Sequence, residues 1–113
     1  MLLSLSLGLV AGLGEELLFR HVLQQAIPLP APLPLLLASL LFAAGHAITP
    51  TYALLSFLAS LFFGSVYASS GLAVAATAHG AYDAVAVCAT HWVVTRKSEG
   101  EKERIRSMEW LKD

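Results

Sequence analysis

Charged residues are scarce in this chain of 113 residues: they make up 13% of it, whereas hydrophobic residues make up 57%. A soluble domain is usually about a quarter charged and about half apolar. A domain of this size also buries only part of its apolar surface, so a water-soluble fold would leave much of that surface exposed. The shortage of charge therefore indicates an integral membrane protein that is surrounded by lipid.

Other features are missing as well. Cys88 is the only cysteine, which excludes an internal disulfide. The chain has no basic patch, so no nucleic-acid partner is expected. Its first residues lack the basic start of a secretory signal peptide, and two glutamates interrupt their apolar run. We also find no internal repeat.

The few charges are unevenly placed. Before Arg96 the only charged side chains are those of Glu15, Glu16, Arg20 and Asp83. All others follow in the last part of the chain. This layout divides the chain into an apolar core, residues 1–96, and a charged, solvent-exposed tail, residues 97–113, expected to be a solvated helix or a disordered end. Lysines and arginines after the last apolar segment predict a C-terminus on the cytoplasmic or an equivalent face.

Four apolar segments make up the core: residues 2–27, 35–47, 51–69 and 72–95. Three of them are long enough to cross a hydrocarbon core of roughly 30 Å. The second is short and is expected to be a tilted or half-buried helix ending at Thr49. Alternating prolines from Pro28 to Pro34 predict an extended hinge, because proline lacks the amide donor of a helix interior. Small residues in the last two segments favour close helix packing. We predict an all-α, multi-pass membrane bundle of about four helices.

Ionisable side chains inside such segments cost roughly 2.5–3.5 kcal/mol each on insertion scales, and they usually serve a function. Glu16 and Arg20 are one helical turn apart with the acid on the N-terminal side, which favours an ion pair. Glu15 is rotated by about 100° around the helix and lacks that partner. Glu15 is therefore a candidate general base. The alternative is a salt bridge between helices with a spare acid at a water-filled edge.

Two further groups contain histidine. His46 alone would usually be a hydrogen-bonded core residue, although an imidazole can also hold a water or a metal. His79 and Asp83 are one helical turn apart, and a carboxylate behind an imidazole fixes its tautomer and raises its basicity. The alternative for this pair is polar contact between helices. Three such groups in one small bundle favour a hydrolytic site.

The remaining polar residues of the core fit structural roles better. His21 lies on a different helix face from Glu15, and His91 lies near the end of the last segment, where an interfacial role is expected. No serine stands in the G-x-S-x-G setting of a nucleophile. Packing or interfacial roles are expected for Tyr52, Tyr67, Tyr82, Ser56, Ser60 and Ser65.

Taken in order, the three groups resemble the motifs of the CPBP intramembrane protease family, which includes type II CAAX prenyl endopeptidases and bacterial Abi proteins. The EExxxR, FxxxH and HxxxD motifs are carried by Glu15-Glu16-x-x-x-Arg20, Phe42-x-x-x-His46 and His79-x-x-x-Asp83. Each motif alone is common. The ordered set, in an apolar chain, is much more specific.

The resemblance implies an intramembrane endopeptidase with its site in a helix-walled cavity. Glu15 and His46 would activate a water, His79 and Asp83 would stabilise the oxyanion and orient the site, and Glu16 and Arg20 would hold the first helix in register. Many members carry asparagine at the position of Asp83, and an aspartate donates a hydrogen bond only when protonated. An ionised Asp83 would instead orient His79. The substrate would be a membrane-tethered protein or peptide. The narrower form of this hypothesis is a prenylated CAAX protein.

Zinc is the alternative to a metal-free water. Glu15, His46 and His79 could supply two imidazoles and a carboxylate, although the chain has no H-E-x-x-H helix. We favour the hypothesis that the water is activated without a permanently bound metal.

Family members usually carry further helices before the first motif, so this chain is either a minimal core or a piece of a longer protein. Similarity to plant and algal plastid members around residues 46–50 and 91–92 suggests a chloroplast membrane.

Two other functions remain open: a non-catalytic membrane scaffold or immunity-type protein, and a proton or ion pathway. A protease requires Glu15, His46 and His79 to meet at one water-accessible point. A scaffold would let them face separate partners, and a relay would need polar steps to both membrane faces.

Overall fold

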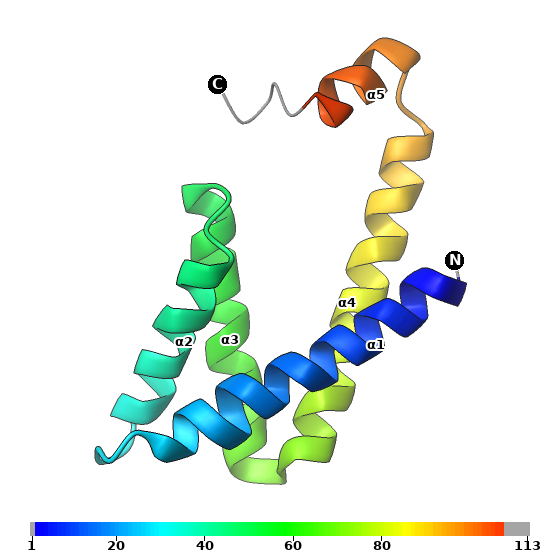
Figure 1. Cartoon of the computed structure of the whole chain (residues 1–113). Coiled ribbons are helices and arrows are strands. Elements are labelled where there is room, and N and C mark those ends of the chain that lie inside the picture. Colours follow the sequence, from blue (N-terminus) through cyan, green and yellow to red (C-terminus); the bar gives the residue numbers. More distant parts are fainter. Residues whose placement is uncertain (1, 108–113) are drawn as a thin grey trace.

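The computed structural model describes the backbone of residues 2–107 and the side chains of residues 5–107. Within this part of the chain the secondary structure is helical throughout (Figure 1). The helices are α1 (Leu2–Glu16), the π-helix η1 (Leu17–Gln24), α2 (Leu33–Gly45), α3 (Pro50–Ser70), α4 (Leu72–Thr95) and α5 (Glu99–Arg106). The α2 and α3 helices form an antiparallel pair, and α1 crosses α4 at a steep angle.

The prediction of an all-α membrane protein is confirmed, and the number of spans is confirmed in part. Both α3 and α4 are long and apolar enough to cross a membrane. The α2 helix is apolar but shorter, and the first apolar segment is divided between α1 and η1. Two of the four predicted helices are therefore suited to span by length and composition, and the number that cross a membrane stays a prediction.

Two predicted boundaries around α2 were wrong. The hinge is shorter than expected because Pro34 lies in the first turn of α2, where a missing amide donor costs nothing. The helix ends at Gly45 and not at Thr49. Thr49 instead caps α3: its Oγ1 accepts a hydrogen bond from the Tyr52 amide at 3.1 Å. A threonine followed by Pro50 in the first turn is a strong start signal, which separates the two helices.

The π-helix η1 follows directly after the two glutamates, where the sequence predicted one continuous α-helix. Segments of this kind are rare and occur mostly as bulges inside α-helices, often at functional sites. Arg20 lies within η1 and is fully buried. The apolar pattern of residues 17–24 does not distinguish a π-helix from an α-helix, so the sequence could not predict η1.

Glycines allow α1 and α4 to touch through their backbones. A Cβ atom at Gly12 would lie 2.9 Å from the Gly80 amide nitrogen, and one at Gly80 would lie 3.2 Å from the Leu9 Cα. Small residues at such crossings are a main source of helix association in lipid. This close crossing brings the glutamates of α1 next to His79 of α4.

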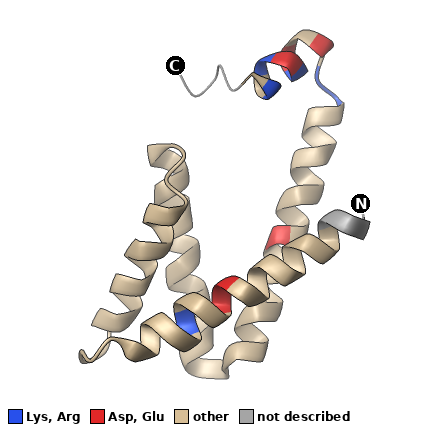
Figure 2. Cartoon of the chain, viewed as in Figure 1, with Lys and Arg blue, Asp and Glu red and all other residues tan. Residues whose placement is uncertain are grey.

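Part of the charged tail forms helix α5, which agrees with the expectation of a solvated helix. Helix α5 begins with a capping box in which Ser98 and Glu101 satisfy each other's amide groups. Figure 2 shows mixed charges gathered on α5, in contrast to the few in the core. The prediction for residues 108–113 lies outside the described residues.

Replacing Gly12 by alanine should destabilise the protein by about 1–3 kcal/mol, because the backbone of α4 must move to admit the new Cβ atom. Gly14→Ala is the matched control, since nothing lies within 4 Å of a Cβ atom there. The measurement is reversible SDS-induced unfolding in mixed micelles. Equal stability of the two variants would show that the crossing is not tightly packed.

Candidate active site

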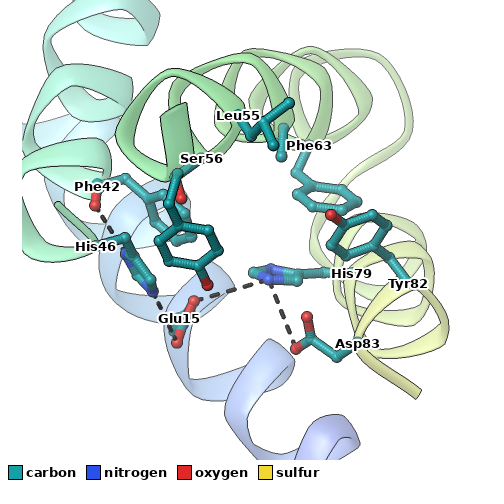
Figure 3. A pocket seen from close by; sticks show the side chains of 11 residues that line it. Glu15, Phe42, His46, Leu55, Ser56, Phe63, His79, Tyr82 and Asp83 are labelled. Carbon is teal, nitrogen blue, oxygen red and sulfur yellow. Dashed lines mark hydrogen bonds and ion pairs between the residues drawn. The ribbon is translucent and has the colours of Figure 1, made fainter. Parts of the chain in front are cut away.

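A polar cavity of about 230 Å³ opens between α1, α3 and α4, beside the end of α2 (Figure 3). Its wall contains all four residues predicted to be catalytic: Glu15, His46, His79 and Asp83. Aromatic rings complete much of the rest: Phe42, Tyr52, Phe63 and Tyr82. Residues from three distant motifs therefore meet at one point. The two tyrosines, expected in packing or interfacial roles, also line this cavity.

Glu15 lies between the two imidazoles. Its Oε1 is 3.8 Å from Nε2 of His46, and its Oε2 is 3.7 Å from Nε2 of His79. Both distances exceed that of a direct hydrogen bond and suit groups that share a water. The Glu15 side chain is 32% exposed, so water can reach it.

The one-turn spacing of the second motif fixes His46. Its Nδ1 lies 2.8 Å from the carbonyl oxygen of Phe42. A carbonyl only accepts, so Nδ1 donates, and Nε2 of the neutral ring is left as an acceptor facing Glu15. The Phe42 ring also stacks on the imidazole, with centroids 4.2 Å apart and planes at 19°. Phenylalanine thus supplies both the hydrogen-bond acceptor and the packing surface.

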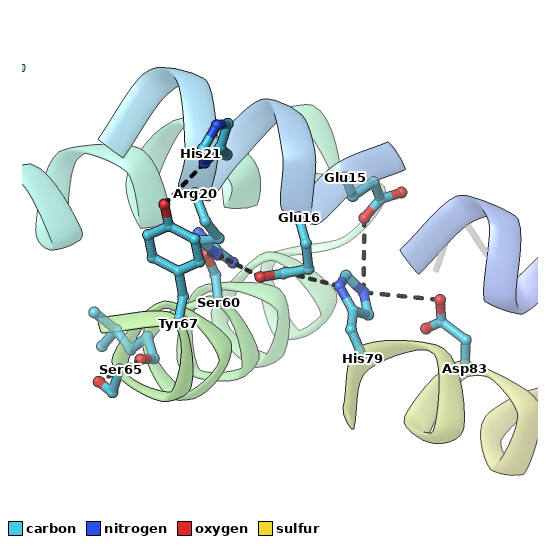
Figure 4. A network of polar contacts seen from close by, with 10 residues as sticks. Glu15, Glu16, Arg20, His21, Ser60, Ser65, Tyr67, His79 and Asp83 are labelled. Atoms are coloured by element: carbon cyan, nitrogen blue, oxygen red, sulfur yellow. Dashed lines mark hydrogen bonds and ion pairs between the residues drawn. The ribbon is translucent and has the colours of Figure 1, made fainter. Parts of the chain in front are cut away.

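His79 is held from α1 and α3. Its Nδ1 lies 2.9 Å from Oε1 of Glu16, and Phe63 stacks on its ring at 4.4 Å. Glu16 is fully buried and pairs with Nε of Arg20 at 3.3 Å, as the sequence predicted. An ionised carboxylate accepts only, so Nδ1 of His79 carries a proton and Nε2 faces the cavity (Figure 4).

Two carboxylates lie next to the His79 ring, and they approach different nitrogens. Asp83 Oδ2 lies 3.7 Å from Nε2 of His79, on the cavity side of the ring. Asp83 is on the same helix as His79, one turn later, and its short side chain does not reach Nδ1. Glu16 reaches Nδ1 because α1 crosses α4 at Gly80. The carboxylate that orients His79 is therefore Glu16.

Ser60 belongs to the buried polar network around Arg20, a role that the sequence did not reveal. Arg20 donates from Nη2 to Ser60 Oγ at 2.9 Å, and both residues are fully buried. The guanidinium also lies 5.5 Å from the centroid of the Phe42 ring, within cation–π range. A usable signal was present, because Ser56, Ser60 and Gly64 recur every four residues and so share one face of α3.

The two histidines predicted to have structural or interfacial roles, His21 and His91, lie outside the cavity, whereas Ser56 lines it together with the two tyrosines. His21 Nδ1 is 3.1 Å from the Tyr67 hydroxyl, which also accepts a hydrogen bond from Gln25. His91 is exposed near the end of α4. This agrees with the separation of His21 from Glu15 around the first helix.

Zinc is the metal that the sequence left open for this site. The residue types of Glu15, His46 and His79 suit the metal. Within residues 5–107, however, no three histidine, cysteine, aspartate or glutamate side chains are grouped as a metal site. No step proposed below passes through a metal.

Replacing Ser60 by alanine should lower the free energy of unfolding by about 1–3 kcal/mol, because the buried guanidinium loses one of its two hydrogen-bond partners. Ser65→Ala is the matched control on the same helix: Ser65 is exposed and bonds only its own helix at Leu61, so a change within about 0.5 kcal/mol is expected. Denaturant unfolding in detergent micelles measures both. A neutral Ser60→Ala variant would show that Arg20 finds another acceptor.

A comparison with protein-family models matches residues 1–85 to the family described as type II CAAX prenyl endopeptidase Rce1-like. Comparisons with curated proteins and with solved structures give no match. The matched region covers most of the chain and contains every residue that lines the cavity. The resemblance of the three motifs is thereby confirmed. The chain belongs to the Rce1-like family of type II CAAX prenyl endopeptidases.

Proposed function

We propose that this membrane protein is an endopeptidase that hydrolyses a peptide bond of a membrane-associated protein with a water activated by Glu15 and His46. The family description makes a prenylated CAAX protein the specific substrate to test. The observation that carries the proposal is the position of Glu15, less than 4 Å from both imidazoles in a cavity that water can enter.

The hydrogen-bonding character of Glu15 and His46 supports activation of a water. The carboxylate and Nε2 of His46 are both acceptors, and they are 3.8 Å apart. A water between them satisfies both by donating one hydrogen to each. Glu15 then takes a proton while the water oxygen forms a bond with the scissile carbonyl carbon. The same proton passes from Glu15 to the leaving nitrogen as the carbon–nitrogen bond breaks.

His79 is suited to stabilise the negative oxygen that forms on the carbonyl. Its Nδ1 is committed to Glu16, so only Nε2 faces the cavity. Nε2 donates to an oxyanion when the ring carries a second proton, and Glu15, Glu16 and Asp83 surround that positive charge with carboxylates. In this scheme Asp83 supports the cationic ring from the cavity side.

The compactness of the polar cluster favours hydrolysis over the two alternatives. A scaffold would not require Glu15, His46 and His79 to converge on one solvent-accessible space. A relay needs polar groups that continue toward both membrane faces, whereas aromatic rings of Phe42 and Phe63 flank the imidazoles here.

Glu15→Gln should reduce cleavage by about 10²–10⁴-fold while the protein remains folded, because the amide cannot accept the proton of the water. Glu103→Gln, in the tail, is the control and should cleave normally. The assay uses protein in liposomes and a quenched peptide that carries a farnesylated cysteine followed by two aliphatic residues and a terminal serine. Undiminished cleavage by purified Glu15→Gln protein would refute the proposed mechanism.

Removal of metals should leave the rate unchanged, because the side chains alone supply the base and the donors in this scheme. The test compares cleavage by liposome-embedded protein before and after dialysis against EDTA. A loss of activity that added zinc restores would contradict the metal-free scheme and leave the assignment as an endopeptidase intact.

A further inference from the structure

The ionisable groups of the cavity are mostly hydrogen-bond acceptors. Ionised Glu15 and Asp83 only accept, and so does Nε2 of the neutral His46 ring. Nε2 of His79 donates only while that ring carries a second proton, because its Nδ1 is committed to Glu16. A developing oxyanion is stabilised by donors that are already in place. The ionisable groups therefore offer it a single donor, and only in one protonation state.

Hydroxyl groups in the cavity wall can act as donors without a change of charge. Three described residues bring a hydroxyl to this wall: Tyr52 and Ser56 of α3, and Tyr82 of α4. A tyrosine hydroxyl keeps its proton at neutral pH and can donate it in a hydrogen bond. The hydroxyl of Tyr52 makes no hydrogen bond with another described residue, so it is available to a bound substrate.

Tyr52 reaches across the cavity from the start of α3. Thr49 fixes its backbone there, with the Tyr52 amide 3.1 Å from Thr49 Oγ1, and its ring lies 6.5 Å from the ring of His46. Tyr52 also lines a neighbouring groove of about 700 Å³, and the other described residues of that groove belong to α1 and α4. A side chain that starts on α3 and lines this groove extends over the cavity that Glu15 lines. The hydroxyl is at the far end of the ring, so it lies over the reaction space.

The other two hydroxyls are less well placed. Ser56 is one helical turn after Tyr52, but its short side chain stays at the α3 wall. The ring of Tyr82 packs edge-on against Phe63, with centroids 6.0 Å apart and planes at 67° (Figure 3). Tyr52 is therefore the hydroxyl that best complements His79 across the cavity.

We propose that Tyr52 is a further catalytic residue, whose hydroxyl donates a hydrogen bond to the carbonyl oxygen of the scissile bond as that oxygen becomes negative. The inference rests on the proposed function, because it assigns a second donor to the same transition state. The hydroxyl keeps its proton throughout. The hydrogen bond weakens again when the carbon–nitrogen bond breaks and the carbonyl re-forms.

The first test removes the hydroxyl and keeps the ring. Tyr52→Phe should lower kcat for the farnesylated peptide in liposomes by about 10²–10³-fold, the usual effect of losing one oxyanion donor. KM should change less than about threefold, because the bond strengthens only in the transition state. An unchanged kcat would overturn the inference, and so would a loss of kcat in Tyr82→Phe instead.

Tyr67→Phe is the matched control, because it makes the same change on the same helix outside the cavity. The Tyr67 hydroxyl contacts His21 and Gln25, and Tyr67 does not line the catalytic space. Its kcat should equal that of the wild type.

The second test measures binding and does not need cleavage. A farnesylated peptide whose scissile amide is replaced by a phosphinate carries a negative oxygen where the oxyanion forms. Its Kd is compared with that of the amide peptide by calorimetry, on Glu15→Gln protein with and without Tyr52→Phe. Tyr52→Phe should weaken phosphinate binding at least about tenfold and amide binding less than about threefold.

This comparison separates a direct role from an indirect one. If phosphinate affinity does not depend on Tyr52 although Tyr52→Phe slows cleavage, the hydroxyl acts through Glu15 and the inference is wrong. Equal weakening of both ligands would also overturn it, because the hydroxyl would then bind substrate and transition state alike.

The inference and the proposed function fail separately in this design. If wild-type protein cleaves the peptide and Tyr52→Phe cleaves it equally fast, only the inference falls. If wild-type protein cleaves no peptide but the phosphinate affinity depends on Tyr52 as expected, the proposed function falls and Tyr52 stands as a donor to a negative oxygen. If no variant binds the phosphinate, the inference falls whatever the cleavage assay shows.

Discussion

The buried ion pair between Glu16 and Arg20 is the interaction on which the rest of this structure depends. Both side chains are fully buried, and each buried charge loses several kcal/mol of hydration that partners must offset. The pair therefore gathers polar groups from other helices: His79 of α4 binds the carboxylate, and Ser60 of α3 binds the guanidinium. One ion pair thus ties α1 and η1 to two other helices and sets the orientation of an imidazole.

The constraint on Glu16 gives Glu15 its different environment. The two residues are adjacent, so fixing one toward the protein interior turns the other into the cavity. Glu16 has no exposed surface. The Glu15 side chain is about one third exposed, lies 3.7 and 3.8 Å from the imidazoles, and makes no direct hydrogen bond with another described residue. A carboxylate held by strong partners serves structure. A neighbouring carboxylate with access to water is suited to chemistry.

The crossing of α1 and α4 shapes both the cavity and a neighbouring groove, which is lined by Gly8, Ala11 and Ala86 among others. Backbones touch where Gly12 meets Gly80, and this contact brings His79 to Glu16. The helices cross steeply (Figure 1) and still touch at Gly8, where an added Cβ atom would lie 3.3 Å from the Cβ of Asp83. The same crossing therefore brings the polar groups of the cavity together and leaves an open groove beside them.

Local sequence determined the helical class, most helix limits and the Glu16–Arg20 pair, and it singled out four candidates that line one cavity: Glu15, His46, His79 and Asp83. These follow from hydropathy, from proline and threonine at helix starts, and from the cost of placing ionisable groups in apolar segments. Only the tertiary structure decided the π-helix, the binding of His79 by Glu16 and of Arg20 by Ser60, and the groove beside the cavity. Those features depend on how helices far apart in the chain cross and fill space, and spacing along one helix does not contain that information.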